Sequence, residues 1–139
     1  MEYIVTKRNH KICITLFSKT EIIEPAVSHI IDDVTGMSEN AAFALSLALT
    51  EALTNAIVHG NKNNPGKKVF TKILIRPDKV VLRVADEGKG FDHETLQDPT
   101  RKENLLKQSG RGIYFIRHFM DEVKFNTTGN EITMVKYLN

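Results

Sequence analysis

The stretch TEALTNAIVHGN, residues 50–61, decides the fold. It closes a run from Glu39 to about Gly60 that is rich in alanine and leucine, both strong helix formers, and Ser38 offers a good N-cap. We therefore predict one long helix over this run, with apolar residues spaced to face a core. Its main apolar stripe consists of Leu45, Leu49, Ala52, Leu53, Ala56 and Ile57.

Two residues of this helix, Glu51 and Asn55, are polar where leucine would serve a core better. Four residues advance a helix by little more than one turn, so the two side chains project side by side. The apolar Leu47 and Val58 lie on the same side and would partly desolvate them. Burying a carboxylate and an amide costs free energy unless they are hydrogen-bonded or bind a ligand. The pair is either part of a ligand site, with His59 as a third candidate, or it caps a neighbouring loop or lies at the surface.

The flanking segments predict strands and two further helices. Residues 11–17 suit a strand, and residues 22–34 have the apolar spacing of an amphipathic helix. Further strands at 68–76 and 79–85, a helix at 112–120 and a closing hairpin at 122–127 and 131–138 complete the order. We expect a single domain over residues 1–139 with an α+β fold: a two-layer sandwich of a mixed, mostly antiparallel sheet with helices packed on one face.

The composition is that of an ordinary soluble protein, with 41% hydrophobic and 26% charged residues and a net charge of +2. Scattered basic residues give no reason to expect nucleic-acid binding. The N-terminus lacks a signal-peptide pattern and we find no apolar run as long as a membrane span, so we expect a cytoplasmic protein with no membrane partner. We interpret the only cysteine, Cys13, as a small buried strand residue, and Phe91, Phe115 and Phe119 as core residues.

A second cluster, DEGKGFD at residues 86–92, directly follows the strand KVVLRVA. Gly88 and Gly90 would let the backbone approach a ligand closely. Asp86, at the end of the strand, could accept a hydrogen bond from an amino group such as that of adenine. The alternative is a plain glycine turn with a solvated acidic residue.

A third cluster, SGRGIYFIRHF at residues 109–119, leads into a helix. The unpaired N–H groups of a helix N-terminus favour anions, and Arg111 adds positive charge, so a phosphate would fit there. The alternative is that Gly110 and Gly112 only permit a sharp entry into the helix. The preceding segment, 92–109, is polar and long, which is typical of a functional loop such as a lid.

Together the three clusters resemble a known family. EALTNAIVHGN, DEGKGFD and GRGIYFI are similar, in this order, to the N box and the two glycine boxes of the histidine-kinase-like (GHKL) ATPases. Within that superfamily, the lid run LQDPTRKENLLKQSGRGI and the tail FMDEV resemble the anti-sigma factor serine-protein kinases. The resemblance extends from about Lys11 to the C-terminus and implies binding of ATP and Mg²⁺.

The resemblance also implies a role for each matching residue. Asn55 would hold a Mg²⁺ that bridges ATP phosphates, since an amide oxygen suits this hard ion. Glu51 would act as the base, or polarising group, for the attacking hydroxyl. Asp86 would bind the adenine amino group, with Gly88 and Gly90 shaping the floor of the pocket.

The phosphates would lie at the second glycine box. The resemblance implies contacts from the backbone N–H groups of Gly110, Arg111, Gly112 and Ile113, with Ser109 next to them. The lid at 92–109 would close over the bound nucleotide. The cofactors implied are therefore ATP and Mg²⁺.

The function implied is an ATP- and Mg²⁺-dependent serine/threonine-protein kinase that phosphorylates a small antagonist protein and controls a regulatory partner. A sigma factor is the partner of the family, which also forms homodimers. The sequence departs from it in having no arginine between Glu21 and Val34, where sigma-binding kinases use one. Either Thr133 or Glu131 could occupy the position that faces Asp86.

Two other functions fit parts of the pattern. A nucleotide-dependent module could sequester a partner with little or no catalytic turnover. The ATPase half of a sensor kinase is a weaker alternative, because these 139 residues include no phosphoacceptor-helix domain. Glu51 is the residue that separates a kinase from a binding module.

Overall fold

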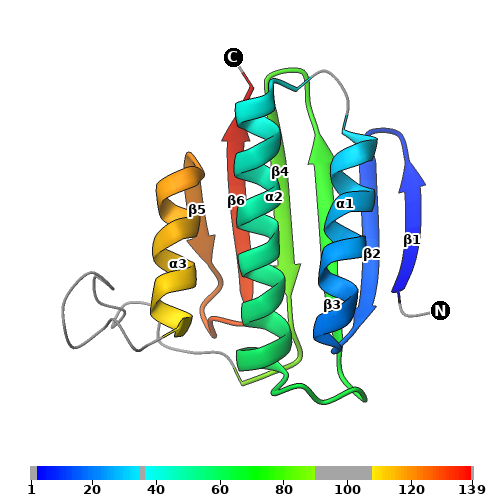
Figure 1. The fold of residues 1–139 in the computed structure, drawn as a ribbon, viewed down its shortest axis with the longest axis vertical. Helices are drawn as coiled ribbons and strands as arrows, with labels where there is room; N and C mark the ends of the chain where they lie inside the picture. Colours follow the sequence, from blue (N-terminus) through cyan, green and yellow to red (C-terminus); the bar gives the residue numbers. More distant parts are fainter. Residues whose placement is uncertain (1–2, 35–36, 90–107, 139) are drawn as a thin grey trace.

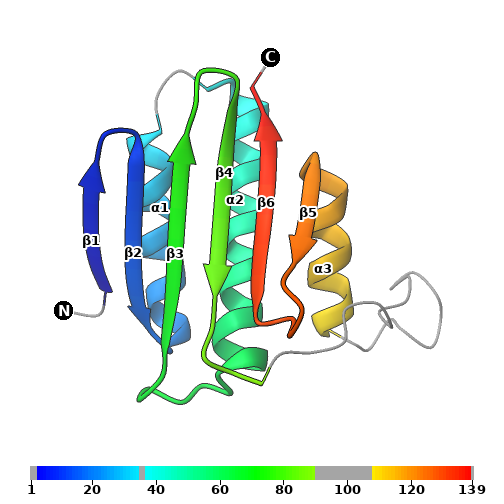
Figure 2. The same cartoon turned by 180° about the vertical axis from the view of Figure 1, so that it is seen from behind.

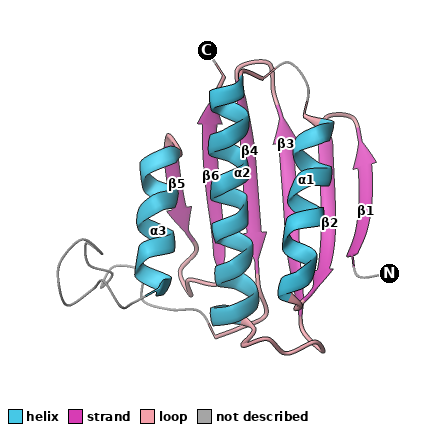
Figure 3. Ribbon diagram, viewed as in Figure 1, coloured by secondary structure: helices cyan, strands magenta, loops and turns pink. Residues whose placement is uncertain are grey.

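A six-stranded sheet with helices on one face forms the fold (Figures 1 and 3). The computed structural model describes residues 3–34, 37–89 and 108–138. The strand order is β1-β2-β3-β4-β6-β5, and all described strand pairs are antiparallel. In chain order the elements are β1 (Tyr3–Arg8), β2 (Lys11–Phe17), η1 (Thr20–Ile22), α1 (Ile23–Asp33), α2 (Glu39–Thr54), η2 (Asn55–Gly60), β3 (Lys68–Ile75), β4 (Lys79–Ala85), α3 (Gln108–Phe119), β5 (Glu122–Phe125) and β6 (Glu131–Tyr137). The predicted α+β fold is confirmed.

The sheet is amphipathic because successive side chains of a strand point to opposite faces. In β2, Ile12, Ile14 and Leu16 are buried beneath the helices, while the residues between them point to the other face. The same alternation holds in β3 and β4. Figure 2 views the sheet from the face on which the described residues place no helix.

Helix α2 is the central helix of the layer and packs between α1 and α3 (Figure 1). Ser38 caps it as predicted, because its Oγ accepts a hydrogen bond of 3.1 Å from the N–H of Ala41. The predicted apolar stripe is confirmed, since all six of its residues are buried. Burial of this stripe fixes which side of α2 faces the sheet, and therefore where Glu51 and Asn55 project.

The last turn of this helix differs from the prediction. We expected regular helix to about Gly60, but residues Asn55–Gly60 form a π-helical turn, η2. The N–H of Asn61 donates to the carbonyl of Ala56 at 2.8 Å, five residues back. Lys62 and Asn63 then adopt left-handed φ values of 53° and 58°, which end the helix. Such π-turns are frequent at functional sites.

Strand β1 was not predicted from the sequence. It forms an edge hairpin with β2 through Asn9 and His10, which both have left-handed φ values, 47° and 46°. Asparagine and histidine tolerate this conformation better than most residues do. The strand was missed because YIVTKR is largely exposed and half polar, so its alternation is weak.

Three side chains are less buried than we predicted. Cys13 is only partly buried, because it lies on the face of β2 opposite the helices. Phe115 is 39% exposed on α3, so its assignment to the core was wrong. Phe119 is partly buried and stacks edge-to-face on the exposed Phe43, with ring centroids 5.9 Å apart. Phe91 lies outside the described residues.

Two helices begin earlier than the sequence indicated. A 3₁₀ turn, η1, precedes α1, so helical structure starts at Thr20 instead of Ile22. Helix α3 begins at Gln108, four residues before the predicted Gly112. The helix therefore includes the last two residues of the predicted lid at 92–109, and the rest of that segment lies outside the described part of the chain.

Residues 39–60 correct one expectation about membranes. This run is long and apolar enough to cross a bilayer, with a mean hydropathy of 1.6 over its best window. Half of that window is buried inside the fold. Core helices of soluble proteins pass the same test of length and composition, and α2 lies on the sheet between two other helices (Figure 1). We therefore interpret it as a core helix.

Candidate functional site

The first and third sequence clusters meet where α2 and α3 pack together. Gly112 lies against Glu51 and Asn55 so closely that a Cβ atom added to it would be 2.9 Å from Glu51 Oε2. The same atom would be 3.3 Å from Asn55 Nδ2 and 3.4 Å from Asn55 Oδ1. Glycine is thus the residue that lets the start of α3 approach this carboxylate and this amide.

Asn55 carries a buried polar atom with no partner. Its Nδ2 is buried and has no hydrogen-bond partner among the described residues. Nearly all buried polar side-chain atoms in proteins have such a partner, so an orphan indicates a ligand or a functional role. A half-turn of the amide exchanges Nδ2 with Oδ1, so this position can present either a donor or an acceptor to a ligand.

The second cluster, residues 86–92, contacts the end of the π-helical turn that follows α2. The carboxylate of Asp86, just after β4, lies against Gly60: a Cβ atom added to Gly60 would be 2.3 Å from Asp86 Oδ2. A Cβ atom on Gly88 would be 2.2 Å from the carbonyl oxygen of Gly60. Both glycines are therefore required for this close approach. The N–H of Gly88 donates to Asp86 Oδ1 at 2.7 Å and fixes the carboxylate in place.

The pKa of Asp86 is raised above its ordinary value of 3.8. Burial is the main cause, and the hydrogen bond from Gly88 and the charge of Lys67 oppose it in part. A raised pKa means that the folded state binds the proton more tightly than the unfolded chain does. The ionised carboxylate therefore lowers the stability of the fold as the pH rises through the raised pKa, and this penalty is absent below 3.8.

Replacing Asp86 by asparagine should accordingly raise the unfolding temperature at neutral pH. The amide removes the buried charge and keeps an oxygen that can accept from Gly88. The gain should shrink as the pH falls and vanish below 3.8, where the wild-type carboxyl is also neutral. Thermal melts of both proteins across this range measure the effect. Asp78→Asn, at an exposed turn, is the matched control, and an equal gain from it would refute the explanation.

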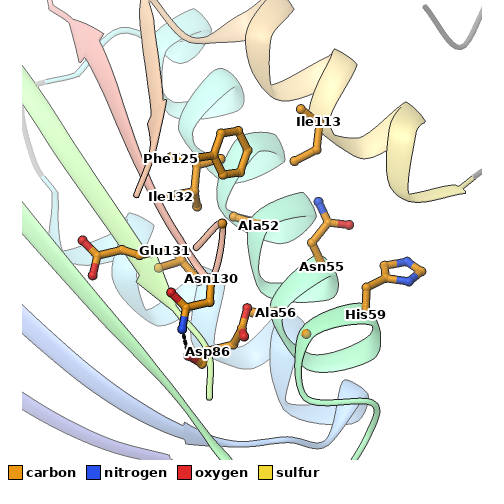
Figure 4. Close-up of a pocket in the computed structure, with 13 residues that line it drawn as sticks. Ala52, Asn55, Ala56, His59, Asp86, Ile113, Phe125, Asn130, Glu131 and Ile132 are labelled. Atoms are coloured by element: carbon orange, nitrogen blue, oxygen red, sulfur yellow. Dashed lines mark hydrogen bonds between the residues drawn. The ribbon is translucent and has the colours of Figure 1, made fainter. Parts of the chain in front are cut away.

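A pocket connects these groups (Figure 4). Asn55, His59 and Asp86 line it together with Asn130, which lies beside Asp86, and with Glu131, the first residue of β6, whose carboxylate points away from Asp86. Its apolar walls come from Ala52, Ala56, Val84, Ile113, Phe125 and Ile132. A mainly apolar pocket with a few polar groups is typical of a small-molecule site.

The pocket brings together only some of the predicted residues. Asn55, Asp86 and Ile113 line it, Gly88 and Gly112 lie beside its polar groups, and Glu51 adjoins it through Gly112. Gly90 lies outside the described residues. Ser109, Gly110 and Arg111 belong to the first turn of α3, whose N–H groups have no partner within the helix, and their side chains are not described.

Two further residues, Asn130 and Glu131, line the pocket near Asp86. Of the two alternatives on the last strand, Glu131 lines the pocket, whereas Thr133 is not among the described lining residues. Asn130 was missed: its carbonyl accepts from the N–H of Asp86 at 2.9 Å, and its Nδ2 donates to the Asp86 carbonyl at 3.4 Å (Figure 4). The turn sequence TTGN before β6 was the only signal for it.

Comparison with known proteins decides the family. The sequence profile of the histidine kinase-like ATPase domain matches residues 19–136, which include the whole pocket. The chain belongs to the histidine kinase-like ATPase family. As a member of this family it is expected to use ATP, which agrees with a pocket that joins all three sequence clusters.

Proteins named as serine-protein kinases or as an anti-sigma factor are similar to the chain. It is 32% identical over 111 residues to the serine-protein kinase RsbW of Listeria monocytogenes, covering 75% of this chain and 71% of that protein. The RsbW kinase of Bacillus subtilis is 34% identical over 102 residues, 68% of this chain and 64% of that protein. The anti-sigma F factor of Anoxybacillus flavithermus is 36% identical over 96 residues, which cover 68% of this chain and 66% of that protein. These relatives support assignment of this ATPase to the protein serine kinases.

Proposed function

We propose that this protein is an ATP- and Mg²⁺-dependent serine/threonine-protein kinase of the anti-sigma type. Its substrate would be a serine or threonine hydroxyl on a small antagonist protein. The observation that carries the proposal is the contact of Gly112 with both Glu51 and Asn55. This contact puts a carboxylate, and an amide whose Nδ2 has no partner among the described residues, next to the start of α3, where phosphates would bind.

In this proposal the adenine ring lies at the Asp86 end of the pocket. The apolar walls would hold the purine, and Asp86 Oδ2 would accept a hydrogen bond from its amino group. Oδ1 is already bound to the N–H of Gly88, so the carboxylate is oriented before the nucleotide arrives. The triphosphate would then extend past Asn55 toward Gly112 and the first turn of α3, residues 108–111.

Asn55 fits a magnesium site of the kind that kinases use. Mg²⁺ is commonly held by one or two protein ligands together with substrate phosphates, so a large cluster of acidic residues is not required. The described residues contain no group of three or more histidine, cysteine, aspartate or glutamate side chains that could hold a metal. The Nδ2 of Asn55 is buried without a partner among the described residues, and a half-turn of the amide would put Oδ1 there as a single protein ligand. The bound ion would neutralise charge on the transferred phosphoryl group.

Glu51 would accept the proton of the acceptor hydroxyl. The hydroxyl oxygen forms a bond to the γ-phosphorus, the bond from that phosphorus to the β-phosphate oxygen breaks, and ADP leaves. Glu51 is partly buried and lies one helical turn from Asn55, beside the proposed phosphate position. A carboxylate there can take the proton without crossing the pocket.

The proposed partners rest on the family resemblance and on the names of the relatives. A small antagonist protein would bring its serine or threonine to Glu51, a sigma factor would be the regulated partner, and the protein would act as a cytoplasmic homodimer. Helix α1 contains no arginine, which weakens the case for the sigma factor relative to the phosphoacceptor.

Gly60→Ala should weaken ATP binding. The added methyl group would overlap Asp86 Oδ2, and the hydrogen bond from Gly88 leaves that carboxylate little room to move. We expect ATP affinity to fall by about 10-fold or more, the value of a hydrogen bond to a charged group. Gly66→Ala is the control, because its methyl group would meet only Asn64 Oδ1, at 3.2 Å. Calorimetric titration of both variants with ATP should separate them, and equal affinities would refute the assigned contact.

Phosphoryl transfer distinguishes a kinase from a sequestering module. Small proteins encoded next to this chain are incubated with it, ATP and Mg²⁺, and examined by intact-mass spectrometry. A kinase adds one phosphate to a serine or threonine and releases ADP. A sequestering module forms an ATP-dependent complex with the partner mass unchanged. Complex formation without transfer by the wild-type protein would overturn the proposed activity and leave ATP binding in place.

A further inference from the structure

Asn61 is a buried side chain to which the proposed reaction assigns no part. It follows η2 directly and is 1% exposed. Its Nδ2 donates to Ser18 Oγ and to the carbonyl of Lys68, both at 2.9 Å, and its Oδ1 accepts from the N–H of Glu87 at 2.8 Å. Both hydrogens of the amide and its oxygen are therefore used, which is full satisfaction for a buried amide.

The partners of Asn61 determine the orientation of its amide. The N–H of Glu87 can only donate, and the carbonyl of Lys68 can only accept. Ser18 Oγ gives its own hydrogen to the carbonyl of Lys67 at 2.7 Å, so toward Asn61 it acts as an acceptor. No other assignment of nitrogen and oxygen satisfies all of these bonds.

One more bond closes these contacts into a ring. The N–H of Lys68 donates to Glu87 Oε1 at 3.0 Å. The ring thus runs from Asn61 to Lys68, from Lys68 to Glu87, and back to Asn61. It connects the residue after η2, the start of β3 seven residues later, and the loop after β4, which is distant from both in sequence.

This ring connects the two segments that lie on either side of the Asp86 carboxylate, the end of η2 and the loop after β4. Glu87 is the next residue after Asp86, and Asn61 is the next residue after Gly60, where an added Cβ atom would be 2.3 Å from Asp86 Oδ2. The N–H of Gly88, one residue beyond Glu87, binds Asp86 Oδ1. The position of the carboxylate relative to the pocket therefore depends on a distance that the Asn61 side chain sets.

We propose that Asn61 is a positioning residue that makes the pocket selective for 6-aminopurine nucleotides. It acts through the loop at Asp86–Gly88, so that the Asp86 carboxylate meets the amino group of adenine at hydrogen-bonding distance. A 6-oxopurine carries an acceptor oxygen in place of the amino group, so its position 6 offers that carboxylate no hydrogen and the nucleotide binds more weakly. This inference rests on the proposed ATP site and adds a specificity residue that does not line the pocket.

The test compares ATP with ITP, which carries an oxo group at the same ring position and the same triphosphate. The folded wild-type protein should bind ATP at least about 10-fold more tightly than ITP, the value of a hydrogen bond to a charged group. Asn61→Ala should reduce this preference for ATP to about threefold or less, mainly by lowering the affinity for ATP. Calorimetric titrations give both dissociation constants, and circular dichroism confirms folding.

Two further variants separate positioning from stability. Ser18→Ala removes the Ser18 partner of the Asn61 amide but leaves all three bonds of the ring, so it should lower the unfolding temperature and keep the ATP-to-ITP ratio. Glu87→Ala removes the exposed carboxylate that accepts from the N–H of Lys68, and so opens the ring. It should lower the ATP-to-ITP ratio with little loss of stability. This variant tests the inference even if Asn61→Ala does not fold.

The possible results lead to different conclusions. An unchanged ratio in Glu87→Ala, and in Asn61→Ala if it folds, overturns the inference and leaves Asn61 with a structural role. If Ser18→Ala lowers the ATP-to-ITP ratio as much as Asn61→Ala or Glu87→Ala does, the inference is also overturned, because loss of stability alone would then explain the change. Wild-type protein that binds neither nucleotide overturns the proposed function and this inference together.

Discussion

Glu51→Gln should lower phosphoryl transfer to the acceptor protein by about 10²- to 10⁴-fold, the usual contribution of a general base. Glutamine keeps the size of the side chain and its contact with Gly112 but cannot take a proton. ATP affinity should stay within about threefold of wild type, because the adenine and phosphate contacts come from other residues. Single-turnover transfer with excess enzyme, measured beside ATP titration, separates the two effects.

The control for this experiment is another glutamate of the same helix. Glu39 lies in the first turn of α2 and is exposed, so Glu39→Gln should leave transfer and ATP affinity unchanged. If Glu51→Gln transferred phosphate at the wild-type rate, the assignment of Glu51 as the base would be wrong. If it lost ATP binding as well, Glu51 would instead be part of the nucleotide site.

Asn55→Ala should make ATP binding insensitive to Mg²⁺. The variant removes the proposed protein ligand to the ion, and charge neutralisation by a bound metal is worth several kcal/mol, so affinity for Mg²⁺-ATP should fall by about 100-fold. Affinity for ATP in the presence of a chelator should change little, because Asp86 and the apolar walls remain. Calorimetric titrations with and without Mg²⁺ give the four constants required.

The matched variant is Asn40→Ala, an exposed asparagine in the first turn of the same helix. It should retain the wild-type response to Mg²⁺. Loss of ATP binding in Asn55→Ala both with and without Mg²⁺ would contradict a metal role. It would indicate that the buried Nδ2, which has no partner in the described structure, binds the nucleotide directly.

The sequence predicted the core and the polar pair well because both follow from helical spacing. The apolar stripe of α2 is buried as expected, and Glu51 and Asn55 lie together against Gly112. Spacing along one helix could not show which glycine would meet them. That contact joins residues about 60 positions apart, and it depends on how α3 packs on α2.

Other features depend on tertiary contacts that no local pattern reports. The π-turn at Asn55–Gly60 was predicted as regular helix, because helix propensity does not distinguish the two forms. The sequence motif TEALTNAIVHGN ends at Asn61 but predicts no role for it, since its partners at Ser18, Lys68 and Glu87 come from three other segments. Phe115 was wrongly assigned to the core, because an apolar residue on a helix need not face the sheet.

Titration of the wild-type protein with ATP, with and without Mg²⁺, tests the central claim most directly. The claim is that three separate stretches of the sequence form one Mg²⁺-ATP site. It predicts one ATP bound per chain, weaker binding when Mg²⁺ is chelated, and loss of most of the affinity in Asp86→Asn. Folded protein that binds no ATP, or that binds it equally well without Mg²⁺ and in Asp86→Asn, would contradict it.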